Sequence, residues 1–121
     1  MPSKRQSYGT WGERVAASYL SARGYSIIAR NVRTPYGEID LVVKTRQTLV
    51  FVEVKTRSTN AFGLPEEAIS TRKRKHILQS AEYYLQELDD YRGDWRVDVI
   101  SIRGKPDQVN PEVVWFENAL A

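Results

Sequence analysis

Cysteine is absent from this chain of 121 residues, and histidine occurs only once. Without cysteine the protein has no disulfide framework and no thiolate zinc site. Long hydrophobic runs are missing as well, since no apolar stretch approaches the roughly 20 residues of a membrane helix. Residues 1–6 are polar and basic and no apolar run follows them, so we expect no secretory signal. These absences favour a soluble cytoplasmic protein that does not bind membranes.

The length fits one domain, and we expect residues 1–121 to form it, with residues 1–7 flexible. The 18 basic and 15 acidic side chains give a formal net charge of +3. Many proteins that bind no polyanion have a charge of this size. Charge alone therefore does not identify a partner.

Hydrophobic periodicity predicts two helices and five strands. In chain order they are a helix over residues 10–23, strands over 25–31, 38–44 and 48–55, a helix over 71–89, and strands over 96–102 and 113–116. A loop with one helical turn from Pro65 is expected between the third strand and the second helix. The order predicts an α/β fold in which a mixed sheet of about five strands is flanked by helices.

Acidic residues stand inside two strands that are expected to form a hairpin. Successive side chains of a strand point to opposite faces of the sheet. One face thus receives Glu38, Asp40 and Val42 from the first strand and Phe51, Glu53 and Lys55 from the second, and the other receives Ile39, Leu41, Val43, Val50, Val52 and Val54. Asp40, Glu53 and Lys55 are therefore expected to point away from the aliphatic face.

The register of this hairpin brings the two acids together. A two-residue turn at residues 46–47 would pair Thr45 with Thr48 and, further along, Asp40 with Glu53. Directly opposed residues have Cβ atoms about 5 Å apart, so the carboxylates would converge. Like charges at that distance repel unless a cation neutralises them.

A divalent metal would neutralise this pair. Ligation by oxygen alone favours Mg²⁺ or Mn²⁺, with the main-chain carbonyl of Val54 as a third ligand. Such an ion polarises a phosphodiester, while Lys55 positions a water or stabilises charge on the phosphate. The pattern predicts phosphodiester hydrolysis. In the alternative interpretation Glu53 and Lys55 belong to a solvated face, and Glu38 simply pairs with Lys55 or Arg57.

Four basic residues, 72–75, stand at the start of the second predicted helix, where the helix macrodipole disfavours positive charge. Phosphate binding explains this placement, and a solvated charge run is the alternative. Helical spacing directs Lys73 toward the sheet and the acids, and directs Arg72, Lys75 and His76 outward. The predicted DNA contacts are Arg57, Arg72, Lys73 and Lys75.

The aromatic residues and the histidine give weaker signals. Trp11, Trp95 and Trp115 have spacings typical of core residues. Tyr36 lies in the turn before the Asp40 strand, where packing within the loop and contact with nucleic acid are both open. His76 has no histidine or cysteine partner at ligand spacing, so we place it on the surface.

Two short runs, Gly-Glu-Ile-Asp at residues 37–40 and Glu-Val-Lys at residues 53–55, have twelve residues between Asp40 and Glu53. They resemble the PD-(D/E)xK signature of the restriction-endonuclease-like superfamily, with isoleucine at position 39 where the signature has proline. Other motifs extend over nearly the whole chain: Gly12-Glu13, Gly24-Tyr25, Arg30-Asn31, residues 53–57, Phe62-Gly63 and the basic helix start. Together they resemble the YraN family of uncharacterised bacterial proteins. That family is similar to archaeal Holliday-junction resolvases of the Hjc type, which are dimeric Mg²⁺-dependent nucleases that cut four-way DNA junctions.

The resemblance implies that Asp40 and Glu53 bind metal, that Lys55 is catalytic, and that Glu13 completes the acidic cluster from the first helix. It also implies branched DNA as substrate, a role in repair or recombination, and a homodimer. For Glu13 the alternative is a first-turn acid that stabilises the helix macrodipole. The expected function is a metal-dependent endonuclease. The alternatives are a non-catalytic nucleic-acid-binding or assembly module on the same fold, and a nuclease that acts on RNA.

Overall fold

The computed structural model describes residues 3–57, 70–89, 91–107 and 110–120. Within them the two helices and five strands follow one another in the predicted order. The elements are α1 (Lys4–Ser21), β1 (Ser26–Thr34), β2 (Gly37–Thr45), β3 (Thr48–Arg57), α2 (Thr71–Glu87), β4 (Asp94–Arg103) and β5 (Glu112–Phe116). The predicted loop with a helical turn from Pro65 lies outside the described residues. No described helix has the length and apolar character needed to cross a membrane.

The strands form one mixed sheet in the order β1-β2-β3-β4-β5. β3 and β4 run parallel, and the other neighbours are antiparallel. A parallel pair needs a long crossover, which here contains α2. The predicted mixed α/β sheet flanked by helices is confirmed.

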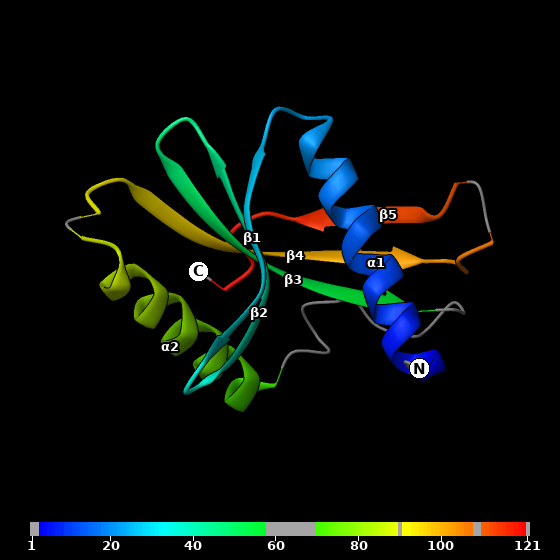
Figure 1. The fold of residues 1–121 in the computed structure, drawn as a ribbon, viewed down its shortest axis with the longest axis horizontal. Coiled ribbons are helices and arrows are strands. Elements are labelled where there is room, and N and C mark those ends of the chain that lie inside the picture. Colours follow the sequence, from blue (N-terminus) through cyan, green and yellow to red (C-terminus); the bar gives the residue numbers. More distant parts are fainter. Residues whose placement is uncertain (1–2, 58–69, 90, 108–109, 121) are drawn as a thin grey trace.

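The two helices cover opposite faces of the sheet (Figure 1). α1 packs on one side with buried residues Ala16, Ala17, Leu20, Leu41, Val43, Val50, Val52, Ile100 and Ile102. α2 packs on the other with Ile39, Val42, Leu49, Phe51, Ile77, Ala81, Val97 and Val99. β3 is therefore covered from both sides, including the face that carries Glu53.

The first helix begins at Lys4, well before the predicted start at residue 10. Ser3 and Gln6 form a capping box, in which Gln6 N donates to Ser3 Oγ (3.1 Å) and Ser3 N donates to Gln6 Oε1 (2.9 Å). This cap satisfies main-chain groups at the helix start without any apolar residue. Periodicity alone therefore placed the start too late.

The register of the β2–β3 hairpin is confirmed from Thr45↔Thr48 to Leu41↔Val52, but the predicted pair Asp40↔Glu53 is not formed in the ladder. The predicted alternation of β2 fails at one position, because Ile39 packs in the α2 cluster and not in the α1 cluster with Leu41. At this point β2 is no longer paired with β3, although it still pairs with β1 at Val32↔Ile39.

The buried carboxylate of Asp98 pairs with Arg96 within β4 and ties this strand to the C-terminal segment. Asp98 is 0% exposed and accepts hydrogen bonds from Arg96 Nε (3.0 Å), Trp115 Nε1 (2.9 Å) and Asn118 N (2.8 Å).

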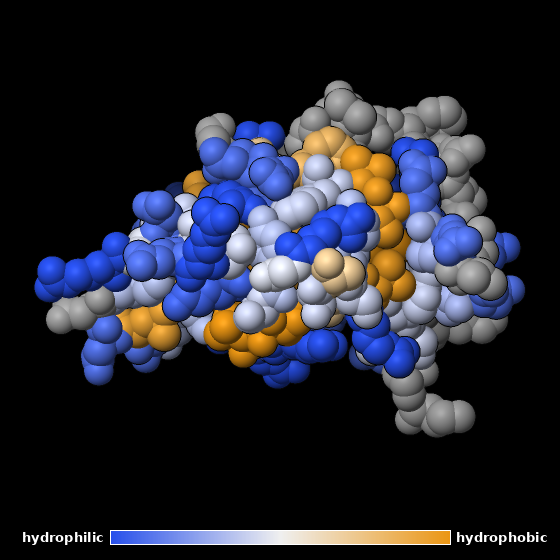
Figure 2. Space-filling model, turned by 90° about the horizontal axis from the view of Figure 1, so that it is seen from above, coloured by the Kyte–Doolittle hydropathy of each residue, from blue (hydrophilic) through white to orange (hydrophobic). Residues whose placement is uncertain are grey.

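Trp95 is 38% exposed, so its assignment to the core is wrong. Other apolar residues also reach the surface, and Figure 2 shows a strip of them between hydrophilic side chains.

Candidate active site

The strands β2 and β3 separate at the predicted site. Leu41 and Val52 form the last described pair of their ladder. Beyond this pair the main-chain N–H of Val54 donates to Asp40 Oδ2 at 2.8 Å. The Asp40 side chain thus occupies the gap between the diverging strands. There it accepts a hydrogen bond from the edge of β3 that is no longer paired with β2.

Asp40 and Glu53 share this gap. Glu53 is only 7% exposed, so the interpretation that it belongs to a solvated face is wrong. Burial, followed by the negative charge of Glu53, raises the pKa of Asp40 to about 8, although the hydrogen bond from Val54 lowers it. A carboxylate pair in such a poorly solvated place is costly unless one member keeps a proton or a cation is present.

Two lysines contact the same oxygen of Glu53. The Nζ atoms of Lys55 and Lys73 lie 3.2 Å and 2.9 Å from Glu53 Oε1. Burial, followed by the neighbouring Lys73, lowers the pKa of Lys55. Burial also acts to lower the pKa of Lys73, but its contacts with Lys55 and Glu53 outweigh this effect and raise it. The predicted orientation of Lys73 toward the acids is confirmed, whereas its contact with DNA stays a prediction.

Glu13 approaches this place from α1. The helix packs closely on β3 at Gly12, where a Cβ atom would overlap Cγ2 of Thr56. Glycine therefore allows the approach that brings Glu13 in. Burial, followed by the charges of Glu38 and Glu53, raises the pKa of Glu13. Because Glu13 lies well past the first turn of α1, the alternative role at the helix macrodipole is wrong.

Asn31 links two of the acids, a role that the sequence analysis missed. With the amide turned so that its nitrogen faces both carboxylates, the orientation that satisfies its hydrogen bonding, Asn31 donates to Glu13 Oε1 (2.9 Å) and Glu38 Oε1 (3.1 Å). The φ angle of Asn31 is 51°, in the left-handed region that asparagine tolerates better than most residues. Glu38 also lies 4.0 Å from Arg33 Nε, so it pairs within the β1–β2 hairpin and not with a basic residue of β3. An asparagine inside a strand was the available signal.

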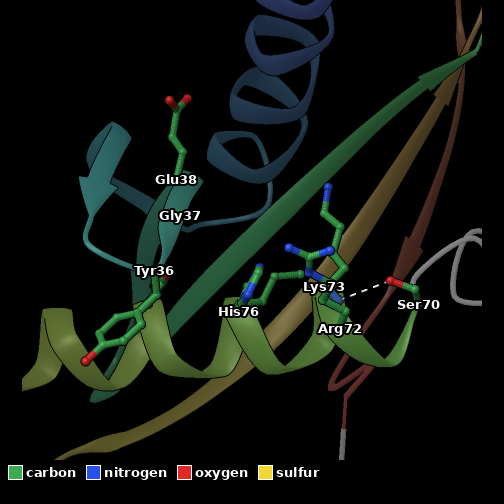
Figure 3. A pocket seen from close by; sticks show the side chains of 9 residues that line it. Tyr36, Gly37, Glu38, Ser70, Arg72, Lys73 and His76 are labelled. Atoms are coloured by element: carbon green, nitrogen blue, oxygen red, sulfur yellow. Dashed lines mark hydrogen bonds between the residues drawn. The ribbon is translucent and has the colours of Figure 1, made fainter.

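A cleft of about 290 Å³ opens between α2 and the β1–β2 turn. Figure 3 shows Arg72, Lys73 and His76 rising from the same side of α2 into this cleft. Arg72 and His76 are exposed, but they line the cleft together with Lys73, so the predicted contrast in direction between them and Lys73 is wrong. Lys75 is also exposed, but it does not line the cleft. Arg57 lies half-buried at the end of β3.

A divalent metal needs several oxygen ligands close together. In the part of the chain that the structure describes, no three Asp, Glu or His side chains are grouped so that they could hold a metal ion. The role of Glu13 as a ligand beside Asp40 and Glu53 therefore stays a prediction. Two carboxylates and the Val54 carbonyl remain, an oxygen set that suits Mg²⁺ when waters complete its shell. These residues fit a divalent cation, because a cation would offset the burial and the repulsion from Glu53 that together raise the pKa of Asp40.

The five-stranded mixed sheet and its two helices define a mixed α/β fold. Residues 12–102 match the model of the uncharacterised protein family UPF0102, and the chain belongs to this family, which is the YraN family that the sequence resembles. A UPF0102 protein of Syntrophotalea carbinolica is 44% identical over 112 residues, covering 93% of this chain and 91% of its own. A second, from Dehalococcoides mccartyi, is 40% identical over 120 residues, covering 99% of this chain and 98% of its own.

A solved structure of Pyrococcus furiosus SfsA in complex with Ca²⁺ is a distant neighbour of the fold. Its TM-score is 0.39 and its sequence identity is 15%, over 87% of this chain. The chain spans 60% of the length of that SfsA chain. A likeness of this degree carries no inference about activity.

Proposed function

We propose that this chain is a metal-dependent endonuclease that hydrolyses phosphodiester bonds in DNA, with structured or branched DNA as its substrate. The observation that supports this most is the meeting of Asp40 and Glu53 in one buried place where β2 and β3 diverge. Such a pair costs stability, and ligation of a cation explains why it is kept. Branched DNA is suggested by the similarity of the family to Holliday-junction resolvases.

Each residue of the site has a role in this proposal. Asp40, Glu53 and the Val54 carbonyl would hold Mg²⁺ or Mn²⁺, which supplies polarisation of the phosphodiester and a water of lowered pKa. The Nζ of Lys55, whose pKa is lowered, accepts a proton from the attacking water or, when charged, stabilises the phosphate. Glu13 extends the acidic end of the site.

The basic residues position the substrate. Arg72 and Lys73, on the cleft side of α2, contact phosphates of the DNA backbone. Lys75, also on α2, and Arg57, at the end of β3, make further phosphate contacts. Such contacts hold a strand without reading its sequence. Two sites are needed to cut a symmetric junction, so we propose a homodimer.

The test is cleavage of labelled linear, single-stranded, flapped and four-way DNA with Mg²⁺ or Mn²⁺, beside Glu53→Gln. The exposed acid Glu82 on α2 provides a matched control, Glu82→Gln. We expect selective cutting that Glu53→Gln loses and Glu82→Gln retains. Equal cutting by all three proteins would overturn the proposal. RNA versions of the same substrates, run in parallel, decide between the two nucleic acids.

A non-catalytic nucleic-acid-binding or assembly module is the second candidate. It is favoured by the two lysines on Glu53 Oε1, which balance the charge of this carboxylate without any metal. Binding with a steep salt dependence and no cleavage under any divalent metal would support it.

A further inference from the structure

We propose that the cleft between α2 and the β1–β2 turn binds an unpaired nucleotide of the DNA, with its phosphate at Arg72 and its base against Tyr36. The inference rests on the proposed function, because it names the local structure of the DNA that the site receives. It assigns the cleft a ligand that combines an anion with a flat ring.

The two ends of the cleft differ in chemistry. Arg72, Lys73 and His76 line one end, and Tyr36 lines the other, further along α2 (Figure 3). Guanidinium and ammonium groups bind phosphate oxygens, and an aromatic ring stacks on the face of a base. The volume of about 290 Å³ is near the lower end of small-ligand sites, which begin at roughly 300 Å³, so the cleft holds one nucleotide and not a duplex.

Tyr36 is held in a fixed, accessible position. Its side chain is 45% exposed, and its ring meets Tyr83 of α2 edge to face, with centroids 6.4 Å apart. Its main-chain N–H donates to Thr34 Oγ1 (3.1 Å), and Thr34 Oγ1 donates to the Gly37 carbonyl (2.8 Å). Thr34 Oγ1 also lies 2.9 Å from Ser80 Oγ of α2. The turn is thus fastened to the helix that carries the cations, and a preorganised site loses less entropy on binding.

The cleft is continuous with the candidate active site. Lys73 lines the cleft and contacts Glu53 at 2.9 Å, so a nucleotide bound at Arg72 lies next to the acids. In a duplex the faces of each base are covered by stacked neighbours, whereas an unpaired base can be splayed out onto an aromatic ring. The site therefore favours DNA with unpaired nucleotides beside the cleaved bond.

Binding by the full chain tests this inference, measured by fluorescence anisotropy in EDTA so that cleavage does not occur. The DNA probes are a continuous duplex and the same duplex with a single-stranded flap. Tyr36→Ala should weaken flap binding by about 5- to 100-fold, the usual contribution of one stacked base, and leave duplex binding within about twofold. Tyr36→Phe keeps the ring and should bind like the wild type. Equal effects on flap and duplex, or no effect on either, would overturn the inference.

Charge variants provide a second comparison on the same probes. Arg72→Ala should weaken flap binding, whereas Arg46→Ala, an exposed arginine in the β2–β3 turn, should not. Equal losses would show that binding depends on overall charge and not on this cleft.

Photocrosslinking of the wild-type protein avoids any effect of substitutions on folding. With 5-iodouracil at the unpaired position, the crosslink should map to Tyr36, and a crosslink outside the cleft, such as at the exposed Trp95, would contradict the inference.

Cleavage assays distinguish failure of this inference from failure of the proposed function. If cutting depends on Glu53 but Tyr36→Ala and Tyr36→Phe bind the flap equally well, the inference fails and the proposed function stands. If Tyr36→Ala selectively loses flap binding but the wild type cuts no substrate, the proposed function fails and the inference stands.

Discussion

The carboxylate of Asp40 accepts the hydrogen bond from Val54 N–H at 2.8 Å, in the gap that opens where β2 leaves β3. This contact fixes an acid at the edge of the central strand, beside the buried Glu53. The hydrogen bond favours the charged form of Asp40, but burial and the charge of Glu53 outweigh it. The free energy that the pair costs in the absence of metal is therefore measurable.

Asp40→Asn tests that cost. The pKa of Asp40 is about 8 in the folded chain against an ordinary value of 3.8, so between these values the folded chain keeps a proton that the unfolded chain has lost. Stability of the wild type then falls as pH rises through this window. Asparagine does not titrate and still accepts from Val54. In EDTA, the difference in melting temperature, Asp40→Asn minus wild type, should increase by roughly 5 °C or more from pH 5 to pH 9.

An exposed aspartate provides the control for this pH effect. Asp107→Asn makes the same chemical change at the surface and should follow the wild type at every pH. Mg²⁺ at pH 8 should raise the melting temperature of the wild type more than that of Asp40→Asn. Parallel curves for all three proteins would contradict the account.

Lys73→Met tests the shared contact on Glu53. After burial, the neighbouring Lys73 is the main cause that lowers the pKa of Lys55. Its removal should raise that pKa and move the pH profile of cleavage to higher pH. Lysine Nζ titration by NMR provides a readout that does not need activity. Lys75→Met, which removes an exposed charge from the same helix, should leave both measurements unchanged, and an unchanged Lys55 in Lys73→Met would refute the coupling.

Gly12→Ala tests the close packing of α1 on β3. The new Cβ would overlap Cγ2 of Thr56, and we expect a loss of about 1–3 kcal/mol in the free energy of unfolding. Gly9 of the same helix has no heavy atom within 4 Å of such a Cβ, so Gly9→Ala should gain about 0.5–1 kcal/mol from helix propensity. Thr56→Ser removes Cγ2 and should rescue Gly12→Ala. Urea denaturation measures all four proteins, and similar effects at the two glycines would rule out the packing argument.

Asp98→Ala tests the buried ion pair on the α1 face. The carboxylate is 0% exposed and bonds to Arg96 through Nε (3.0 Å) and Nη2 (3.2 Å). Loss of one partner of a buried pair costs about 3–5 kcal/mol. Urea denaturation should show a loss of this size, whereas the exposed Asp94→Ala should change stability by about 0.5 kcal/mol or less. A loss below about 1 kcal/mol at Asp98 would show that the pair contributes little.

The sequence was sufficient for the order of the elements and for the hairpin register. Strand alternation and a two-residue turn allow only one register that keeps both cores apolar, and this register extends to Leu41↔Val52. Helical spacing also predicted that Lys73 points toward the acids. These features depend on local periodicity, which a single sequence contains.

Contacts between distant segments could not be predicted in this way. Asp98 lies among apolar residues of β4, but its partners Trp115 and Asn118 become neighbours only once β5 pairs with β4. The bridge from Asn31 to Glu13 likewise depends on how closely α1 packs on the sheet. The change of side at Ile39 occurs where β2 separates from β3, and no periodic pattern encodes this separation.

Binding of Mn²⁺ tests the central claim most directly, because it asks whether Asp40 and Glu53 form a metal site. The signal of free Mn²⁺ in electron paramagnetic resonance, recorded with a flapped DNA present, gives the affinity for the wild type, Glu53→Gln and Glu82→Gln. We expect bound Mn²⁺ in the wild type and Glu82→Gln, and affinity at least tenfold lower in Glu53→Gln. The same affinity in all three proteins would contradict the account.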